Sequence, residues 1–469
     1  MGGNAFSSAG LNTPRMSPSV YTFVRNECQK KLSELYVCVA TPIEGPAKKD
    51  YGDVDILVCL ERRAVFPRDE LDLTIPQPRF GQDILGQIGE QLGASRINYL
   101  PGNKSANYAL PWPDHLLPAM DCTQPNGTTR PSENKKAPLH VQVDVQIDTT
   151  VDEMQWHLFK HAHGDIWHLI GVMIRPLGLT VDEEALWLRI PEIEWVNKKQ
   201  AKVKLSSDPA DVLRFLGFSG RGCTETNLKT TSNGVVKCVS SADANDDDSR
   251  LLYEAWSQPF ATVQDLFWYL TTCHWFFQTT PVPVTAESAE GAAPLRSNDR
   301  RRLASRPLFA RWINEFIPQL QEEGRFDDAL PVAVVREHVR DAAFSRFPAV
   351  RETYHERLHA FLVQRQRDFI KKEVIKPSVP LDVDANKRGV VVSALKKIIL
   401  EGDQTFGITP RDTLLNVDGL YESDRVKAWV EKNWEDVLES AWKINGQRAT
   451  EAMRKRDLKR KMAETDNRE

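Results

Sequence analysis

The sequence predicts an α+β fold: a mixed, mainly antiparallel sheet flanked by helices, followed by a helical second region and a C-terminal helical extension. Three observations lead to this prediction. Apolar or alternating segments of strand length lie in the first 150 residues. Helical periodicity takes over from Val151, and long charged amphipathic segments follow Arg300.

The elements of the N-terminal part follow from residue spacing. Apolar residues at three-to-four spacing predict helices, and HVQVDVQI alternates strictly, as a half-buried strand does. Pro42, Gly45 and Pro46 separate two strands. The predicted order is a helix over 17–36, strands over 36–40 and 53–60, a helix over 83–95, a short strand over 107–110 inside the Pro-, Asn- and Gly-rich stretch 101–138, and a strand over 140–147.

The rest of the chain is predicted to be mainly helical. A short helix over 208–218 should begin at Asp208, with Pro209 in its first turn. An acidic loop over 239–249 and a flexible linker rich in Thr, Pro, Ala, Glu and Ser interrupt the helical pattern. Long helices are predicted over 330–373, 386–400 and 422–462. The resulting regions are 1–190, 191–280, the linker 281–299 and 300–469.

Composition narrows the class of protein. The chain has 469 residues, 41% hydrophobic and 27% charged, with a net charge of −4, so no overall basic surface indicates nucleic acid. Its seven cysteines are scattered without a CxxC pair, which favours a reducing compartment over disulfides or a zinc ribbon. MGGNAFSSAG lacks signal-peptide features, and no apolar stretch reaches membrane-spanning length. We therefore expect an intracellular protein, in cytoplasm or nucleus, with no membrane partner.

The segment KKDYGDVDILV contains the carboxylates that predict a metal site. In a strand, Asp53 and Asp55 share one face, because alternate residues point the same way. Two adjacent carboxylates repel each other unless a cation neutralises them, and Mg²⁺ prefers such oxygen ligands. Asp144, in HVQVDVQI, would join them if its strand lies beside Asp53–Leu60. Three such carboxylates can hold two ions roughly 3.5–4 Å apart. Solvated carboxylates on ordinary amphipathic strands are the alternative interpretation.

These segments resemble the polymerase-beta-like nucleotidyltransferase superfamily, with its Asp-x-Asp strand and a later third Asp. The sequence is more closely similar to a group of uncharacterised phage-type nucleotidyltransferases. The similarity covers residues 1–318, and the matching segments are MGGNAF, TPRM with Tyr21, KKDYGDVDILV, Gln142-Val143-Asp144, HGDIWHLIGVMIRPLGL, DVLRFLGF and RRRLASRPLFARWINEF. Thr41-Pro42 stands where the superfamily usually has a Gly-Ser loop that cradles the triphosphate.

The resemblance implies a nucleotidyltransferase palm over 1–190 and a substrate-closing region over 191–280, whereas the charged helical region over 300–469 is predicted from the residue pattern, and its role stays open. It implies Mg²⁺ or Mn²⁺ held by Asp53, Asp55 and Asp144, and transfer of a nucleoside monophosphate from an NTP such as ATP to an acceptor hydroxyl. Asp53 and Asp55 would bridge both ions, and Asp144 would serve the acceptor side. The nucleotide-binding residues would be Thr41, Gly45, Lys48, Lys49 and Gly52, and the second-layer residues Asp165 and Arg175.

Several alternatives stay open. Asp148 or Asp121 could replace Asp144, and His157 with His161 could form a zinc site, although no further ligand pair follows at zinc-like spacing. The acceptor could be an RNA or DNA 3′ end reached through basic clusters at 296–306 and 454–461. It could equally be a protein or a small molecule. A non-catalytic binding or scaffold protein is the third interpretation, which the Thr41-Pro42 departure allows.

Overall fold

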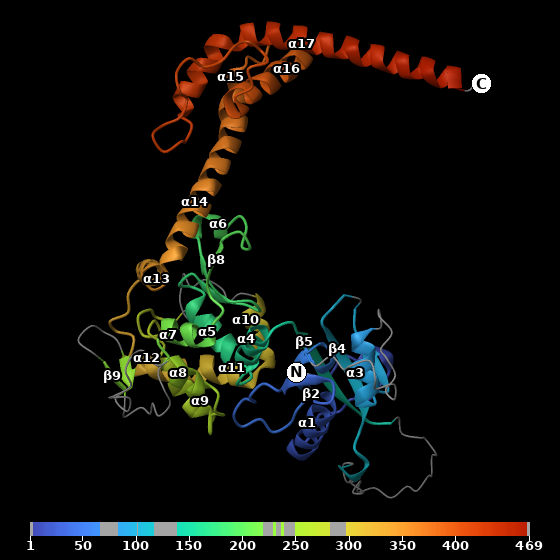
Figure 1. Cartoon of the computed structure of the whole chain (residues 1–469). Coiled ribbons are helices and arrows are strands. Elements are labelled where there is room, and N and C mark those ends of the chain that lie inside the picture. Colours follow the sequence, from blue (N-terminus) through green and yellow to red (C-terminus); the bar gives the residue numbers. More distant parts are fainter. Residues whose placement is uncertain are drawn as a thin grey trace, which may run out of the picture. The chain divides into compact units, whose positions relative to one another are not determined.

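The computed structural model describes residues 3–65, 83–100, 102–116, 138–218, 228–230, 236–238, 249–281 and 297–466. The chain divides into two compact units, Met1–Val350 and Arg351–Glu469 (Figure 1). The strands that the structure describes all belong to the first unit, and the second is helical.

The first unit contains a five-stranded sheet in the order β1-β2-β5-β4-β3. The parallel pair is β2 with β5, and the other three neighbouring pairs are antiparallel. A mixed, mainly antiparallel sheet is thus confirmed. The strands are β1 (Tyr36–Ala40), β2 (Asp53–Glu61), β3 (Arg96–Asn98), β4 (Ser105–Pro111) and β5 (His140–Asp148).

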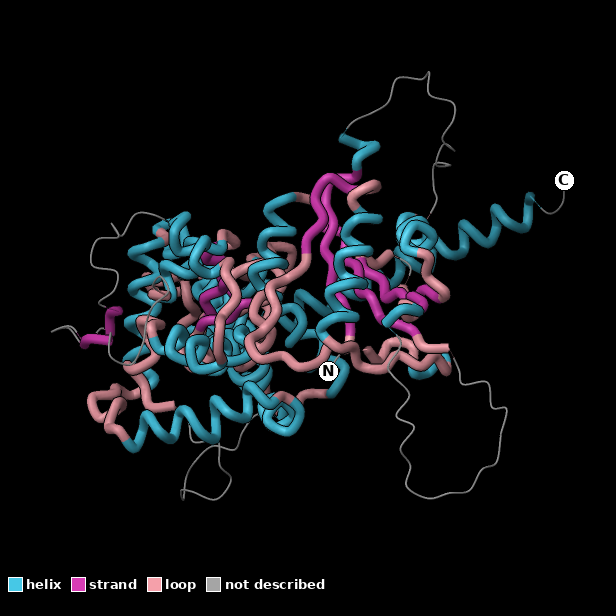
Figure 2. Tube along the Cα trace, turned by 90° about the horizontal axis from the view of Figure 1, so that it is seen from below, coloured by secondary structure: helices cyan, strands magenta, loops and turns pink. Residues whose placement is uncertain are grey.

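Helices pack on both faces of this sheet (Figure 2). On one face, α1 (Pro18–Leu32) and α3 (Ile84–Leu92) cover the main core, which contains Val54, Ile56 and Val58 of β2 and Val141, Val143 and Val145 of β5. On the other face, α4 (Val151–His161) packs through Met154 against Leu57 and Cys59. It leaves the Asp53 end of β2 without apolar cover, and that is where the carboxylates lie.

Local sequence signals explain where the helices begin and end. The Ser17 side chain accepts a hydrogen bond from the Val20 backbone and starts α1. This helix ends at Leu32, earlier than the predicted residue 36, because Tyr36 pairs with Glu61 in the sheet. As predicted, Asp208 caps α7 (Pro209–Leu216), its carboxylate accepting from the Asp211 backbone at 2.8 Å.

The second part of this unit is mostly helical but contains strands that were not predicted. A three-stranded antiparallel sheet is formed by β6 (Leu179–Val181), β7 (Leu186–Arg189) and β8 (Lys202–Ser206), and β9 (Leu228–Thr230) pairs with β10 (Val236–Cys238). The helical prediction from Val151 onward is wrong here, because strands of three to five residues are too short to show a clear period. The shorter helical elements that complete this unit are η1 (Ser7–Ala9), α2 (Arg62–Val65), η2 (Asp114–Leu116), α5 (Ile166–Ile174), α6 (Pro191–Glu194), α8 (Ser249–Trp256), α9 (Val263–Thr271), α10 (Ser297–Ser305), α11 (Pro307–Arg311), η5 (Trp312–Phe316), α12 (Ile317–Glu322) and α13 (Val332–Arg346).

The second unit has its own apolar core, which includes Ile370, Leu395 and Val430. Its residues come from η6 (Ile370–Ile375), α16 (Ala385–Lys396), η7 (Lys397–Glu401) and the first half of α17 (Ser423–Asp466). Beyond Ala441 the described side chains of α17 are mainly exposed. The three long helices predicted after residue 330 are confirmed, with a break at Phe347-Pro348. The helical elements of the second unit are α14 (Pro348–Phe369, which begins before the unit boundary at Arg351), η6 (Ile370–Ile375), α15 (Lys376–Ser378), α16 (Ala385–Lys396), η7 (Lys397–Glu401) and α17 (Ser423–Asp466).

Two predicted connecting segments fall largely outside the described residues. Most of the acidic loop 239–249 and most of the linker 281–299 are in this group. The last linker residues, 297–299, are helical instead and begin α10. Asp299 is buried there and pairs with Arg175 and Arg302, which fixes this turn of helix.

Candidate active site

The two carboxylates of the Asp-x-Asp segment lie on one face of β2. Val54 and Ile56 are fully buried on the opposite face, in the core under α1. Asp53 is half-buried and Asp55 is exposed. The predicted alternation therefore holds, and both acids lie on the face that α4 covers only farther along the strand.

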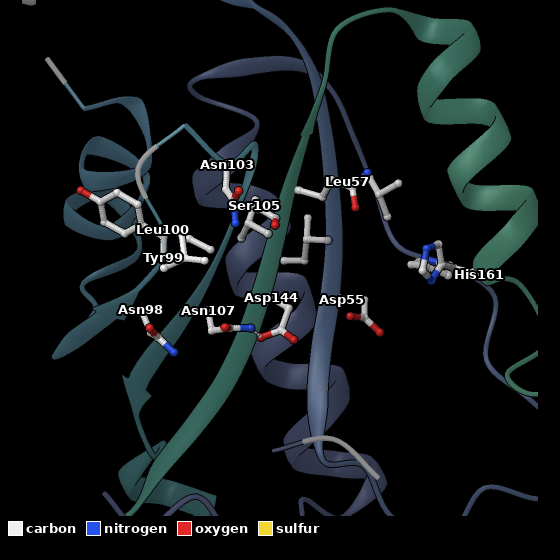
Figure 3. A pocket seen from close by; sticks show the side chains of 15 residues that line it. Asp55, Leu57, Asn98, Tyr99, Leu100, Asn103, Ser105, Asn107, Asp144 and His161 are labelled. Atoms are coloured by element: carbon white, nitrogen blue, oxygen red, sulfur yellow. Dashed lines mark hydrogen bonds between the residues drawn. The ribbon is translucent and has the colours of Figure 1, made fainter. Parts of the chain in front are cut away.

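Asp144 stands beside Asp55 because β2 and β5 run parallel in register, with these two residues as direct partners. In Figure 3 their carboxylates lie on the same side of the neighbouring strands. Two amides orient Asp144: Asn107 Nδ2 donates to its Oδ1 at 2.7 Å, and Gln142 Nε2 lies 2.9 and 3.2 Å from its two oxygens. Three adjacent strands of one sheet thus contribute to the surroundings of this carboxylate.

Crowding changes the protonation of both acids. Desolvation by the surrounding protein, followed by the negative charges of Asp53 and Asp144, raises the pKa of Asp55 to about 7. Burial also raises the pKa of Asp144 to about 6, against the hydrogen bonds from Asn107 and Gln142, which lower it. Because the Asp55 side chain is exposed to solvent, water screens part of the repulsion there. Asp55 and Asp144 therefore bind protons more readily than isolated carboxylates do.

Asp55 and Asp144 line a cavity of about 550 Å³, here called the strand cavity. Its other polar lining includes Asn98, Asn103 and Asn107 and also His161, at the end of α4 (Figure 3). None of the described residues that line it is Lys or Arg. The strand cavity therefore combines anionic oxygens with neutral amides, which suits a cation and a hydroxyl-bearing ligand.

The N-terminal segment closes the beginning of β2 and β5. Gly3 has a φ of +88°, and a Cβ on it would lie 2.5 Å from the Gly52 carbonyl oxygen. The Ala5 backbone N–H donates to Gln142 Oε1 at 3.0 Å, and Gln142 in turn contacts Asp144. Only glycine fits this close approach in this conformation. The segment thus lies against the residues next to the carboxylates.

The predicted phosphate-binding residues line a second cavity of about 510 Å³, here called the loop cavity. Thr41, Gly45 and Lys48 line it together with Arg25. Pro42 borders both cavities, so they adjoin. Of the other two predicted residues, Gly52 is buried under Gly3 and Lys49 is exposed, and neither lines this cavity.

An acidic residue sits among these cations. Lys48 Nζ lies 2.6 Å from Glu44 Oε2, and the Tyr21 hydroxyl donates to the other oxygen at 2.5 Å. Tyr21 also stacks on Tyr51, with ring centroids 3.9 Å apart. Lys48 is therefore held in the loop cavity by Glu44, and a bound phosphate would have to compete with that carboxylate.

The loop between β1 and β2 is fastened to the turn between α4 and α5. The His163 backbone N–H donates to the Ile43 carbonyl at 2.6 Å, and His163 has a φ of +58°, which is unusual for a residue other than glycine. Its fully buried ring contacts the Trp256 carbonyl through Nε2 at 2.7 Å. This anchor sets the position of Gly45, whose Cα lies against Gly164.

The proposed second-layer residues lie elsewhere. Asp165 pairs with Arg306, and Arg175 Nη2 lies 3.2 Å from Asp299 Oδ1. Neither lines the strand cavity or the loop cavity. They join α5 to α10 through these ion pairs, and their assignment to the second layer around a nucleotide stays a prediction.

The basic clusters have different environments. In α10, Arg302 pairs with Asp299, and Arg306 pairs with Asp165, so part of the 296–306 cluster stabilises the fold. In the second unit, Arg454, Lys455 and Arg456 are exposed on α17.

Another group of side chains holds its possible metal-ligand atoms close together. Among the described residues, Asp148, Glu153 and His157 place one ligand atom each within 4.8 Å of the others. The set Asp53, Asp55 and Asp144 does not. Asp148 follows Asp144 on the same face of β5 but is covered by α4, and Asp121 lies outside the described residues.

Three residues that border the candidate site were not predicted from the sequence. Asn107 was predicted within a strand, but its neighbour Asp144 could not be known without the register of β4 on β5. His161 was considered only as a zinc ligand, whereas it lines the strand cavity. Glu44 gave no signal, since a single acid in a Pro-Gly loop is common.

Comparisons with known proteins add no assignment. No known protein-family model matches the sequence, and no curated protein matches it. Among the described residues, no helix is both long enough and apolar enough to cross a membrane.

Proposed function

We propose that this chain is a metal-dependent nucleotidyltransferase with a palm-type catalytic sheet. It would transfer a nucleoside monophosphate from an NTP to an acceptor hydroxyl and release pyrophosphate. The observation that supports this most is the pairing of Asp55 with Asp144 on adjacent parallel strands, at the edge of a cavity, with both pKa values raised. Nucleotidyl transfer needs mainly such positioning and charge neutralisation.

The donor set fits a hard divalent cation. Asp53, Asp55 and Asp144 would hold Mg²⁺ or Mn²⁺, which when bound neutralises phosphate charge and lowers the pKa of the acceptor hydroxyl. The raised pKa values of Asp55 and Asp144 support this fit, because desolvation and the charge of Asp53 disfavour both ionised carboxylates, and a bound cation would stabilise them.

The chain's own residues would position the reactants. Lys48 and Arg25 in the loop cavity would contact the triphosphate, with backbone N–H groups of the loop around Gly45. Pro42 has no N–H to offer, so these cations carry more of the binding than in a Gly-Ser loop. Asn107 and Gln142 hold the Asp144 carboxylate in place from two sides.

The transfer step is a single displacement. The acceptor oxygen forms a bond to the α-phosphorus, the bond from that phosphorus to the pyrophosphate oxygen breaks, and the acceptor's proton passes to Asp144. Asn107 and Gln142 favour the ionised form of Asp144, which can accept a proton, because their hydrogen bonds lower its pKa.

Two acceptor classes are candidates. A nucleic-acid 3′ end is favoured by the exposed Arg454, Lys455 and Arg456 of α17. A small molecule or protein hydroxyl is favoured by the neutral amides Asn98 and Asn103 of the strand cavity. Salt-dependent binding of RNA or DNA would separate the first class from the second.

Label transfer tests the proposal. Each α-labelled NTP is incubated with Mg²⁺ or Mn²⁺ and with pooled RNA, DNA ends, total protein or a small-molecule extract. We expect transfer and pyrophosphate release by the wild type, loss of both in D55N/D144N, and retention in D50N, a control at an exposed acid that pairs with Arg15. If no label is transferred to any acceptor and NTP binding does not depend on metal, the binding or scaffold interpretation is favoured.

A further inference from the structure

We infer that Asp148, Glu153 and His157 form a second metal site, which takes a first-row divalent transition ion such as Zn²⁺ and fastens α4 to the end of β5. This site does not depend on the proposed transfer reaction. One ligand atom from each of the three residues lies within 4.8 Å of the other two. Asp148 and His157 are buried and Glu153 is half-buried, so the group differs from a solvated cluster of acids.

The local structure brings the ligands together in a short stretch of chain. Asp148 is the last residue of β5, Glu153 lies in the first turn of α4, and His157 follows one turn later on the same helical face. Glu153 is fixed by the Thr149 backbone N–H, which donates to its Oε2 at 2.7 Å. The strand end and the helix start therefore hold the three side chains without a contribution from a flexible segment.

An unsatisfied oxygen is the second observation. The Asp148 side chain is fully buried, and its Oδ2 has no hydrogen-bond partner. Its Oδ1 lies 2.8 Å from His157 Nδ1 and 3.0 Å from Gln146 Nε2. A buried carboxylate oxygen without a donor is costly, and a cation would satisfy it. No described side chain supplies that donor, so a ligand to Oδ2 is the simplest completion of this site.

The donor set selects the class of metal. One imidazole nitrogen with two carboxylates suits Zn²⁺ and related ions, whereas Mg²⁺ and Ca²⁺ prefer oxygen ligands alone. Asp148 lies four residues from Asp144 on the same strand, so the site is roughly 13 Å from the strand carboxylates. Gln146 contacts both Asp148 and His157 and also lines the strand cavity. The ion would therefore stabilise one wall of that cavity.

Lys104 works against the site and provides a diagnostic variant. Its Nζ lies 3.4 Å from Glu153 Oε1 and is itself exposed. An ammonium group so close lowers the affinity for a cation by repulsion. Lys104→Met should therefore tighten metal binding without altering a ligand, which a purely structural Asp148–His157 pair would not explain.

Metal titration of the full chain tests this inference. After chelator treatment and dialysis, Zn²⁺ is titrated against a chromophoric competitor, and Co²⁺ spectra report the ligand set. We expect one tight equivalent in wild type and in D55N/D144N, at least tenfold weaker binding in D148N and H157Q, and tighter binding in K104M. The control D152N changes an exposed neighbouring acid and should bind like wild type.

Three outcomes would overturn the inference. The first is the absence of stoichiometric Zn²⁺ or Co²⁺ binding in the wild type. The second is equal affinity in wild type, D148N and H157Q, each shown to be folded by circular dichroism. The third is loss of the ion in D55N/D144N alone, which would assign the metal to the strand carboxylates and support the proposed function. Binding that survives D55N/D144N, with no transferase activity in the wild type, would instead support the second metal site and count against the proposed function.

Discussion

Asp55 of β2 and Asp144 of β5 are direct partners across two parallel strands, although 88 residues separate them in the sequence. Neighbouring strands are about 4.8 Å apart, so the two carboxylates share one small region of the sheet surface. Asp53 adds a third negative charge that raises the pKa of both. The predictions below follow from this arrangement and from the segments that surround it.

Divalent cations should stabilise the wild type through these carboxylates. At a Mg²⁺ concentration of about 100 times Kd, binding to the folded state alone contributes about 2.7 kcal/mol. We expect the melting temperature to rise with Mg²⁺ in the wild type and to be unaffected in D55N/D144N. Differential scanning calorimetry over a Mg²⁺ series measures this, and an equal rise in both proteins would place the ion elsewhere.

The raised pKa of Asp55, which desolvation and the negative charges of Asp53 and Asp144 cause, makes stability depend on pH. The folded-state pKa of Asp55 is about 7, above the usual value near 3.9 in an unfolded chain. Between these values the folded state binds more protons, so stability falls as pH rises through this window and the loss is complete above about pH 7. In the absence of metal, Asp55→Asn should raise the melting temperature at pH 8, on the order of 2 °C, and should give no gain near pH 4. A gain of equal size at both pH values would contradict charge repulsion as the cause.

Asn107 should tune the protonation of Asp144. Its amide stabilises the ionised carboxylate, so Asn107→Ala should raise the pKa of Asp144 above about 6. The acidic limb of the pH–activity profile should then move to higher pH. Asn98→Ala is the matched control, since Asn98 lines the same cavity and has no hydrogen bond to Asp144 among those that the structure describes. The same shift in both variants would argue against a specific effect on Asp144.

Gly3 should be intolerant of a side chain. A Cβ would lie 2.5 Å from the Gly52 carbonyl, and the φ of +88° adds strain. Gly10→Ala is a control with a φ of +73° and no atom within 4 Å of the new Cβ. Both variants should lose about 1 kcal/mol from backbone strain in denaturant unfolding, and only Gly3→Ala should also lose metal and nucleotide affinity. Unchanged affinity in Gly3→Ala would show that the N-terminal segment does not shape the site.

Lys48 and Lys49 should differ in nucleotide binding. Lys48 lines the loop cavity, where it forms an ion pair with Glu44. Lys49 is exposed and does not line that cavity. Lys48→Met should weaken NTP binding about tenfold, by the loss of a charge-assisted contact of about 1.4 kcal/mol, and Lys49→Met should have little effect. Glu44→Gln should strengthen binding because it removes the competing carboxylate. Fluorescent-nucleotide titration distinguishes these variants, and equal effects at both lysines would indicate only general electrostatic attraction.

The sequence predicted the strands unevenly, for a physical reason. β2 and β5 are nine residues long, so their extent could be predicted, and Asp53 and Asp55 could be placed on one face. The position of Asp144 beside them depended on the pairing of the two strands. β6, β7 and β8 have three to five residues, and their amphipathic pattern is too brief to exceed the helical background. β3, with three residues, was missed for the same reason.

Contacts between residues far apart in the sequence also limited what could be predicted about the site. Asp165 and Arg175 looked available to a nucleotide because their partners, Arg306 and Asp299, lie more than 100 residues later. The close approach of Gly3 to Gly52 was not predicted either, because it joins two segments far apart in the sequence. Charge pairing across such distances has no local sequence pattern, so only the fold decides which polar residues are free for chemistry.

The parallel pairing of β2 with β5 also has a consequence for how the protein folds. Antiparallel neighbours can form through short turns, but this pair is joined by the long connection from residue 62 to residue 139, which contains β3 and β4. Such non-local pairings form slowly, because the entropy of closing a long loop is lost before the contacts are gained. The acidic pair is therefore expected to come together late, and a nascent or truncated chain that ends before His140 has only Asp53 and Asp55 of the three proposed ligands.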